Sequence, residues 1–527
     1  MGALDLFTSV VTSSVYLLIL SLLLTVYYRL SFHPLRNYPG PFFGKLSNAY
    51  GGYHSLTKRY HLTTLKNHLK YGPIVRQRPN RLVFNSVTAL QDIYQNPRIT
   101  KSYAYERSRL APNPTLFDTM ETDLHRRKRK ILSQATSERW MRLFEPTMLE
   151  QVDVFLRELM DSSLQPVNMT DRCDYLAVDV VGHLAFGYPL NLQTEETRRG
   201  VPKGMAMNGT RINLYLQFPE VSKLETIVRW LGKKETEKFI KFFETMIQSR
   251  LSQDKDAKYD LYSLAADFYN SEGSDGLSSS ELWTEAMFFL TAGGTTTSTS
   301  MCSVFFYLSR NAHCYQKLAE EIRTTFKHGS EIRSGQQLTS CKYLRACIDE
   351  AIRMSPSSLA PPWRTQSYED QGREPVIIDG HVIPRGTEVA VSLYSLLHNE
   401  EYFPDPFRFV PERWMEPAVP ESEENQAARA VMHKAFAPFA LGARGCPGKP
   451  MLYLEDSLTI AKTMWYFDFE RAPGDLGHVG EGKPGDKWGR RRVDEFQVFD
   501  NVTASHDGPV LIFKPRKGAY DDLGKKN

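Results

Sequence analysis

The chain has 527 residues, of which 41% are hydrophobic, and this is enough for a large buried core. Its 65 basic and 61 acidic residues leave a formal net charge of +4, so the composition gives no support for a nucleic-acid partner. The six cysteines are scattered without a paired framework, which argues against a disulfide-stabilised secreted module and indicates a reducing compartment.

The first predicted element is an apolar segment from Leu6 to Tyr28 that contains no charged residue. As a helix it would be about 35 Å long, enough to cross a bilayer with some tilt. Only Asp5 precedes it, whereas several basic residues follow, and this distribution favours a cytoplasmic body. A cleaved signal peptide is the alternative, but the segment is long and has no basic residue before it. We therefore expect residues 1–28 to be a membrane anchor.

A proline-rich segment follows the anchor, with three prolines in the eight residues from Pro34 to Pro41. Proline fixes the backbone angle φ, so we expect residues 29–45 to form a stiff, extended hinge. No linker divides the rest of the chain, and residues 46–527 are predicted to form one domain. The expected fold is mostly α with small β-sheets. Strands are expected near Ile74 to Phe84, Pro375 to Ile383 and Glu388 to Leu393, and helices dominate from about Val87 to Arg353.

A basic run lies in the helical region and reads His125-Arg126-Arg127-Lys128-Arg129-Lys130. His125 and Arg129 are four residues apart and therefore share one helix face. The remaining basic residues are most simply interpreted as a solvated face. The alternative is a docking surface for an acidic protein, since opposite charges steer such encounters.

The longest predicted helix begins at residue 278, ends near Leu308 and contains Ala292-Gly293-Gly294-Thr295-Thr296-Thr297. Two glycines and three threonines are poor helix formers, so they indicate that something needs the space. A flat cofactor against the helix would need it, and so would another helix packed closely at a small-residue patch. The threonine hydroxyls are expected to bond carbonyls one turn earlier and to open a local bulge.

A short pattern, Glu350-Ala351-Ile352-Arg353, puts an acidic and a basic side chain on one helix face. Taken alone, it would be an ordinary surface ion pair of little energetic value.

A loop near the C-terminus places Cys446 before an apolar helix expected from Met451 to Trp465. A thiol loses its proton at neutral pH only in positive surroundings or on a metal. Arg444 lies two residues before the cysteine, and the helix turns its free N–H groups toward the sulfur. These features predict a soft, anionic metal ligand, and a buried free cysteine is the alternative.

The same loop carries Phe439, Gly442 and Gly448, which allow the backbone to approach closely and an aromatic ring to pack beside the sulfur. The pattern Phe-x-x-Gly-x-Arg-x-Cys-x-Gly resembles the haem-binding loop of the cytochrome P450 haem-thiolate family. The resemblance extends along nearly the whole chain. It implies a cytochrome P450 fold preceded by one N-terminal transmembrane helix. It also implies haem b, an iron protoporphyrin bound through the Cys446 thiolate, which favours O–O cleavage.

The resemblance assigns roles to the earlier motifs. Thr296 takes the position of the threonine that serves oxygen activation, and Thr295 takes the position of an acidic residue that normally relays protons. A threonine hydroxyl can pass a proton but cannot hold a charge. Glu350 and Arg353 would form a buried structural group with Arg413. For His398, a surface or core histidine is a close alternative. The residues implied in haem binding are His125, Arg129, Ala292, Arg364, His398, Phe439, Gly442, Arg444 and Gly448.

The implied function is that of a monooxygenase, which inserts one oxygen atom from O2 into a hydrophobic small molecule. Electrons would come from NADPH through NADPH–cytochrome P450 reductase, docked on the basic run. The protein would lie in the endoplasmic reticulum membrane with a cytoplasmic catalytic domain, and its resemblance is to fungal members, often of secondary-metabolite pathways. Thr295 keeps an alternative open, in which a haem-thiolate enzyme dehydrogenates, couples or isomerises its substrate without inserting oxygen. A non-catalytic haem sensor is a third hypothesis.

The resemblance also places the substrate walls, in five segments: Tyr103 to Asp118, Val201 to Glu220, Phe288 to Ala292, Ser357 to Trp363 and Val502 to Pro509. Their expected apolar and aromatic residues are Tyr105, Leu116, Phe117, Leu214, Tyr215, Phe218, Phe288, Phe289 and Trp363.

Overall fold

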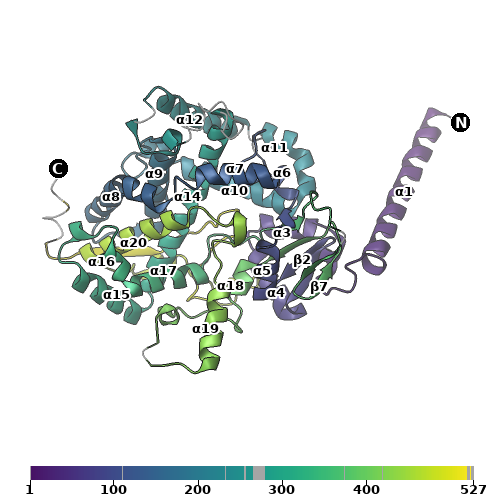
Figure 1. Ribbon diagram of the computed structural model, residues 1–527. Coiled ribbons are helices and arrows are strands. Elements are labelled where there is room, and N and C mark those ends of the chain that lie inside the picture. The colour runs from purple at the N-terminus through teal and green to yellow at the C-terminus, as the bar shows by residue number, and fades with distance from the viewer. Residues whose placement is uncertain are drawn as a thin grey trace.

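The computed structural model describes residues 2–109, 111–231, 233–254, 257–264, 279–372, 374–417, 419–518 and 523. The chain is mostly helical with small sheets, as predicted (Figure 1). The helices of the first half are α1 (Ala3–Ser31), α2 (Phe42–Leu46), α3 (Ala49–Leu56), α4 (Tyr60–Tyr71), α5 (Val87–Tyr94), α6 (Ala104–Arg107), α7 (Thr122–Leu132), α8 (Glu138–Asp161), α9 (Met169–Phe186), α10 (Val201–Gln217), α11 (Glu225–Leu231) and α12 (Lys233–Leu251). Those of the second half are α14 (Ser279–Leu308), α15 (Ala312–Thr325), α16 (Gln336–Ser340), α17 (Lys342–Met354), α18 (Leu393–Leu397), α19 (Glu423–Ala435) and α20 (Lys449–Tyr466).

Three small sheets lie beside the helices. The five-stranded sheet has the order β1 (Ile74–Arg78), β2 (Arg81–Phe84), β8 (Glu388–Val391), β5 (Arg364–Gln366) and β3 (Ile99–Lys101). The other sheets are β4 (Pro166–Asn168), β10 (Val510–Pro515) and β9 (Phe467–Arg471), and the hairpin of β6 (Val376–Ile378) and β7 (His381–Ile383). The predicted strands are confirmed, whereas β3 and β5 were not predicted. Their antiparallel register places Lys101 directly opposite Arg364.

Helix α14 runs through the centre of the body, packed against α9, α17 and α20. Its start was predicted at residue 278, which lies outside the described residues. The glycines serve close helix packing, because a Cβ added at Gly293 or Gly294 would lie 2.7 Å from a valine methyl carbon of α9. Close helix packing therefore explains the two glycines, and the same segment also lines a cavity through Ala292, Gly293 and Thr296, so both explanations apply to it. The predicted bulge is wrong, since α14 remains α-helical from Ser279 to Leu308.

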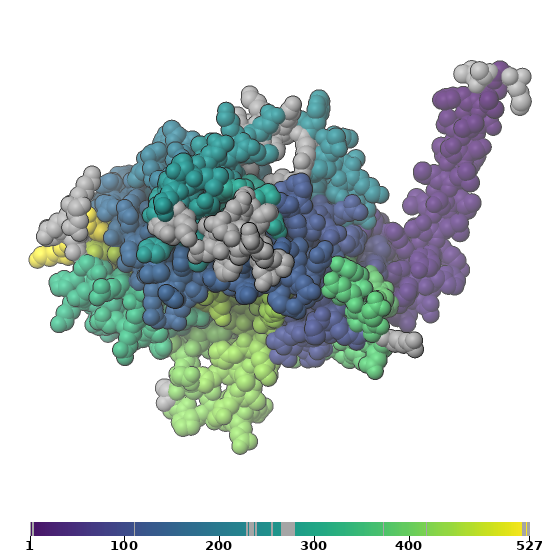
Figure 2. Space-filling model, turned by 45° about the horizontal axis from the view of Figure 1, so that its top comes forward, coloured from purple at the N-terminus to yellow at the C-terminus, as the bar shows by residue number. Residues whose placement is uncertain are grey.

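Helix α1 stands apart from the body (Figures 1 and 2). Residues 5–31 of it are long and apolar enough to cross a membrane, and the span is not buried against the body. The helix continues three residues beyond the predicted end at Tyr28. The prediction of an extended hinge is wrong for the residues that follow, because Arg36 and Tyr38 close hydrogen-bonded turns. Leu35 is fully buried in the core beside the five-stranded sheet, so this segment is packed rather than a free spacer.

Candidate active site

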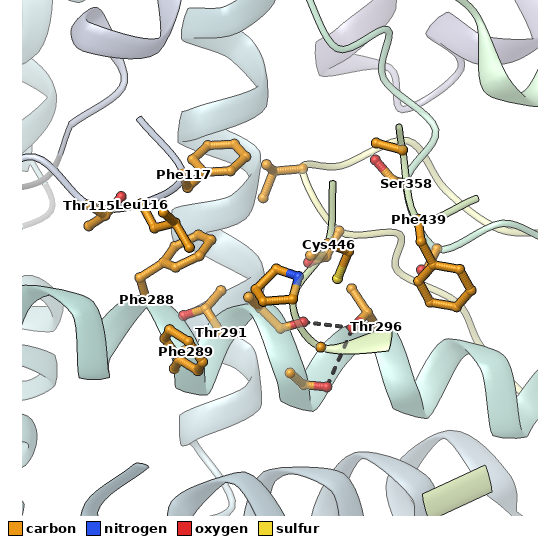
Figure 3. Close-up of a pocket in the computed structure, with 18 of the residues that line it drawn as sticks. Thr115, Leu116, Phe117, Phe288, Phe289, Thr291, Thr296, Ser358, Phe439 and Cys446 are labelled. Carbon is orange, nitrogen blue, oxygen red and sulfur yellow. Dashed lines mark hydrogen bonds between the residues drawn. The ribbon is translucent and has the colours of Figure 1, made fainter. Parts of the chain in front are cut away.

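A cavity of about 370 Å³ lies between α14, the cysteine loop and the segments before α7. Figure 3 shows Cys446 facing the middle of α14, with Thr296 on the helix side and Phe117 and Phe288 further along the cavity. The rings of Phe117 and Phe288 stack with centroids 5.2 Å apart. One cavity therefore joins a thiol, a threonine hydroxyl and an aromatic wall.

The cysteine loop is held by its own backbone and by the end of α5. The Cys446 N–H donates to the Phe439 carbonyl at 2.8 Å, which closes the loop. Gly442 has a φ of 70°, and a Cβ there would lie 2.1 Å from the Tyr94 carbonyl oxygen. Only glycine fits such a backbone without strain. Gly442 therefore shapes the loop from outside the cavity, whereas Phe439 and Gly448 line the cavity.

The thiol of Cys446 lies deep within the protein, and its accessible surface faces the cavity. The surrounding protein raises its pKa by burial, while the Gly448 N–H, the Arg129 guanidinium and the Lys449 N–H lower it. The expected N–H groups at the start of the apolar helix are thus present. The nearby cation is Arg129, which donates to the Gly445 carbonyl, and not Arg444 as the sequence spacing predicted.

Helix α14 presents adjacent threonines to different surroundings. Thr296 lines the cavity, and its hydroxyl donates to the Ala292 carbonyl at 2.6 Å. Ala292 also lines the cavity. Thr295 donates to the Thr291 carbonyl at 2.9 Å and is not among the cavity-lining residues. The bonds one turn back are those predicted, and of Thr295 and Thr296 it is Thr296 that is placed to meet a molecule in the cavity.

Basic side chains gather at one end of the cavity around His125. We call Lys101, Arg129, Arg364 and Arg444 the cationic group, and all four line the cavity together with His125. They come from β3, α7, β5 and the cysteine loop. His125 and Arg129 share a face of α7, as their spacing predicted.

The cationic group has no carboxylate within ion-pair distance among the residues that the structure describes. Arg444 donates to the Thr119 and Met120 carbonyls and the Thr100 hydroxyl. Lys101 donates to two backbone carbonyls, including that of Leu116 at 3.0 Å. The partners of Arg129 and Arg364 are likewise backbone carbonyls.

This uncompensated charge changes the ionisation of its neighbours. Burial and then Arg444, Lys101, Arg129 and Arg364 lower the pKa of His125 to about 2. Burial and then Arg364 lower the pKa of Arg444 to about 10. Like charges directly opposite one another on paired strands, as Lys101 and Arg364 are, also destabilise a sheet. A ligand that carries two negative charges on one side would compensate the positive charges of the cationic group. The two propionates of a haem therefore fit this end of the cavity, and its iron fits the Cys446 sulfur.

A comparison with protein-family models matches residues 34–479 to Cytochrome P450. The chain belongs to the cytochrome P450 family. Cytochrome P450 monooxygenase atnE of Emericella nidulans is 33% identical over 504 residues, covering 93% of each chain. Cytochrome P450 monooxygenase AKT7 of Alternaria alternata is 32% identical over 504 residues, covering 93% of this chain and 94% of the relative. Cytochrome P450 monooxygenase apf7 of Gibberella fujikuroi is 32% identical over 517 residues, covering 93% of this chain and 95% of the relative.

Family membership makes this chain a haem-thiolate oxidoreductase, because the family binds haem through an axial cysteine thiolate. Its enzyme class is that of the P450 monooxygenases, which act on small molecules with electrons from a redox partner. The family resemblance predicted from the sequence is thus confirmed.

The predicted substrate walls all contribute residues to the cavity of this P450. The expected side chains that line it are Tyr105, Leu116, Phe117, Phe288 and Phe289. The other expected side chains, Leu214, Tyr215, Phe218 and Trp363, are absent from the cavity lining. Trp363 is fully buried, and its indole N–H donates to Gln217 at 3.0 Å, so it supports the core instead.

His398 does not join the cationic group. It is buried, its Nδ1 lies 2.8 Å from the Tyr394 carbonyl oxygen, and its ring stacks on Phe407. Burial and the nearby Arg353 hold its pKa well below the usual value. The structure therefore favours the alternative, a neutral core histidine, over a propionate contact.

The basic run of α7 is less exposed than predicted. Lys128 is fully buried and pairs with Glu285 at 3.0 Å, so it is a core ion pair and not part of a solvated face. Arg126 remains exposed and pairs with Asp123. Any docking surface on α7 therefore excludes Lys128.

Lys101 is the member of the cationic group that the sequence reasoning missed. It is a single lysine in a three-residue strand, and it reaches the cavity only because β3 pairs with β5 across more than 260 residues of chain. The one available signal was its place two residues before the predicted substrate wall that begins at Tyr103.

A buried ion-pair group joins α17 to the short helix Pro411–Trp414. Arg353 donates to Glu350 at 2.9 and 3.0 Å, and Arg413 of the short helix Pro411–Trp414 donates to the same carboxylate at 3.0 Å. Trp414 adds an indole N–H bond at 2.9 Å. Burial opposes ionisation of Glu350, but Arg353 and then Arg413 outweigh it and lower its pKa. The predicted Glu–Arg–Arg group is therefore formed.

Proposed function

We propose that this P450 inserts one oxygen atom from O2 into a hydrophobic small molecule, with Cys446 as the axial ligand of haem b. The observation that carries the proposal is the single cavity onto which Cys446, Thr296 and the cationic group all open. When bound through a thiolate, haem supplies the activation of dioxygen. The amino acids supply orientation, exclusion of water and movement of protons.

Each part of the cavity has a distinct task in this proposal. His125 and the cationic group bind the two haem propionates, while the Gly448 and Lys449 N–H groups stabilise the Cys446 thiolate. The stacked Phe117 and Phe288 rings bury apolar substrate surface. The Thr296 hydroxyl can exchange its Ala292 bond for a cavity molecule and pass on a proton.

Electrons come from NADPH through NADPH–cytochrome P450 reductase in this proposal. Helix α7 borders the cysteine side of the cavity through Arg129, and its exposed basic residues, Arg126 among them, would dock an acidic partner. Helix α1 anchors the enzyme in the endoplasmic reticulum membrane with its catalytic body in the cytoplasm. The fungal relatives support a role in secondary-metabolite biosynthesis.

Isotopically heavy dioxygen tests the reaction type. The precursor that accumulates when the gene is deleted is supplied to membranes that contain this protein, the reductase and NADPH. We expect a product that carries one heavy oxygen atom. A product without it, lighter by two hydrogens or unchanged in mass, would overturn the proposal in favour of dehydrogenation, oxidative coupling or isomerisation. The observation that favours that second function is Thr295, an uncharged residue in the position of the acidic proton relay, which lies outside the cavity lining.

Thr296→Ala is expected to lower product formed per NADPH by about tenfold or more, because a positioned proton-transfer group is lost. Hydrogen peroxide released per NADPH should rise. The matched control is Thr295→Ala, which removes the neighbouring hydroxyl and an equivalent bond to the preceding turn but leaves the cavity wall intact. Equal effects of the two substitutions would contradict the role of Thr296. Consumption of no NADPH by the wild-type protein with any substrate would instead favour a haem sensor.

Removal of one cation tests the propionate site. Arg364→Leu is expected to weaken haem retention by about tenfold or more, because a charge-assisted hydrogen bond contributes about 1.5–3 kcal/mol. Haem transfer to an excess of apomyoglobin measures the loss. Arg126→Leu on exposed α7 is the control and should retain haem like the wild type. If both variants retain haem equally, the cationic group does not hold the propionates.

A further inference from the structure

Two adjacent carboxyl groups of α20 are buried where this helix packs on α14. Glu455 and Asp456 are both fully buried. The Ser300 hydroxyl of α14 donates to Asp456 Oδ2, and Ser300 itself lines the cavity. Ser300 lies four residues after Thr296 and therefore on the same face of α14. A buried acid is thus joined to the cavity by a single hydroxyl.

The surroundings of Asp456 contain little to stabilise a negative charge. Among the described residues, its Oδ1 atom and both carboxyl oxygens of Glu455 have no hydrogen-bond partner. The titratable groups that face this pair are Cys173 of α9, which is close to both carboxyls, and Cys302 of α14, whose free thiol is hydrogen-bonded to that of Cys173. None of these supplies a positive charge, so a proton on the carboxyl is favoured.

The ionisation of the pair agrees with this placement. Burial raises the pKa of Asp456 to about 8, and the Ser300 bond only partly opposes it. Burial and then Asp456 hold the pKa of Glu455 well above its usual value. A neutral carboxyl can both donate and accept a hydrogen bond, so either oxygen of the Ser300–Asp456 contact can be the donor.

We propose that Asp456 and Ser300 form a proton relay into the cavity. The relay takes the place of the acidic residue that the family resemblance leads one to expect at the position of Thr295. This inference rests on the proposed function, because oxygen insertion consumes the protons that the relay supplies. Asp456 acts through Ser300 and does not line the cavity, so it is a positioning residue.

The proton transfers of the relay balance. The O–H bond of Asp456 breaks as its proton binds Ser300 Oγ, while the Ser300 proton leaves for a water or substrate oxygen in the cavity. Asp456 is left as a carboxylate and regains a proton from Glu455 through an intervening water molecule, because the two carboxyl groups make no hydrogen bond to each other. Glu455, Thr459 and Lys462 follow one face of α20 at spacings of four and three residues, which leads away from the cavity.

The outer end of this face reaches solvent. Lys462 pairs with Asp153 of α8 at 2.6 Å, and the Asp153 side chain is 36% exposed. The Glu455 carboxyl and the Thr459 hydroxyl have no hydrogen-bond partner among the described residues, so recharging the relay along this face requires water molecules between them.

A second serine–carboxyl pair provides a matched control. Ser298 of α14 donates to Asp174 of α9, and burial raises the pKa of Asp174 to about 7. Neither residue lines the cavity. The two pairs thus share helix, chemistry and a raised pKa, and they differ in access to the cavity.

Infrared spectroscopy of the haem-loaded, full-length protein tests whether Asp456 holds the proton. At neutral pH we expect a carbonyl stretching band of a protonated carboxyl that Asp456→Asn removes and Ser300→Ala shifts to higher frequency. Asp174→Asn should remove a different component. If Asp456→Asn removes no protonated-acid band, Asp456 is ionised and the proposal is wrong. Should Asp456→Asn not fold, an unshifted spectrum of Ser300→Ala overturns it equally.

Turnover tests whether the proton is used. With reductase, NADPH and substrate, we expect Asp456→Asn to lower product per NADPH by about tenfold and to increase the solvent deuterium isotope effect, and Asp456→Glu to restore both. Asp174→Asn should match the wild type. Equal losses in the Asp456 and Asp174 variants would show a structural role and overturn the relay. If the wild-type protein oxidises no substrate, the proposed function fails, while the infrared result still decides where the proton resides.

Discussion

Replacement of Cys446 by alanine is expected to abolish the thiolate-type spectrum of the reduced, carbon-monoxide-bound protein. Alanine offers no ligand atom to iron. Histidine at this position would offer a neutral nitrogen, which lacks the electron donation of a thiolate. The Cys446→Ala and Cys446→His variants should also lose monooxygenation, and the carbon-monoxide difference spectrum together with the haem content measures the effect.

The control for this expectation is Cys341→Ala, which removes a buried sulfur outside the cavity lining. Its spectrum should be that of the wild type. Survival of the thiolate spectrum in Cys446→Ala would mean that another sulfur binds the iron, and the assignment of the axial ligand would then be wrong.

Local sequence was sufficient to predict the elements that carry the chemistry. The cysteine loop, the threonine segment of α14 and the Glu350–Arg353 pair are each contained within ten residues, so their spacing alone fixes which side chains share a face. The fold class followed from the long helical patterns. The apolar residues 6–28 likewise predicted α1, although the end of that helix was misplaced by three residues.

Long-range pairing decided what local sequence could not predict. Lys101 and Arg364 meet only because β3 pairs with β5, and Asp456 meets Ser300 only because α20 packs on α14. His398 was mistaken for a cofactor contact because its packing on Phe407 has no sequence signal. Such contacts depend on which faces of distant elements are buried together, and a single sequence does not contain that information in any local pattern.

The same limit explains why the surroundings of two basic residues were predicted wrongly. Arg444 is two residues from Cys446 in sequence, yet its guanidinium turns to the carbonyls of Thr119 and Met120. Lys128 sits in a run of six basic residues, yet α14 supplies Glu285 to pair with it in the core. In both cases a residue's neighbours in sequence were not its neighbours in space.

Glu350→Gln is expected to destabilise the fold by about 3–5 kcal/mol, the cost of leaving buried charges uncompensated. The Glu350 and Arg353 side chains are fully buried, and Arg413 is 10% exposed. The glutamine amide keeps one acceptor oxygen but no charge, so the two buried guanidinium groups of Arg353 and Arg413 are left without a counter-charge. Urea unfolding followed by far-ultraviolet circular dichroism measures the change, and the yield of soluble, haem-loaded protein should fall with it.

Glu138→Gln is the matched control, since Glu138 and Arg142 form a helical ion pair whose side chains are 83% and 70% exposed. It should change stability by only about 0.3–0.5 kcal/mol.

The Glu350 carboxylate should also make the stability of the wild-type protein depend on pH. The folded-state pKa of Glu350 lies below its usual value, so its contribution is complete above the unfolded pKa and is lost as pH falls through the folded value. Wild-type stability should therefore decline in acid more steeply than that of Glu350→Gln, because the variant has no carboxylate there to protonate. Parallel acid profiles of the two proteins would show that the Glu350 carboxylate does not stabilise the fold through its charge.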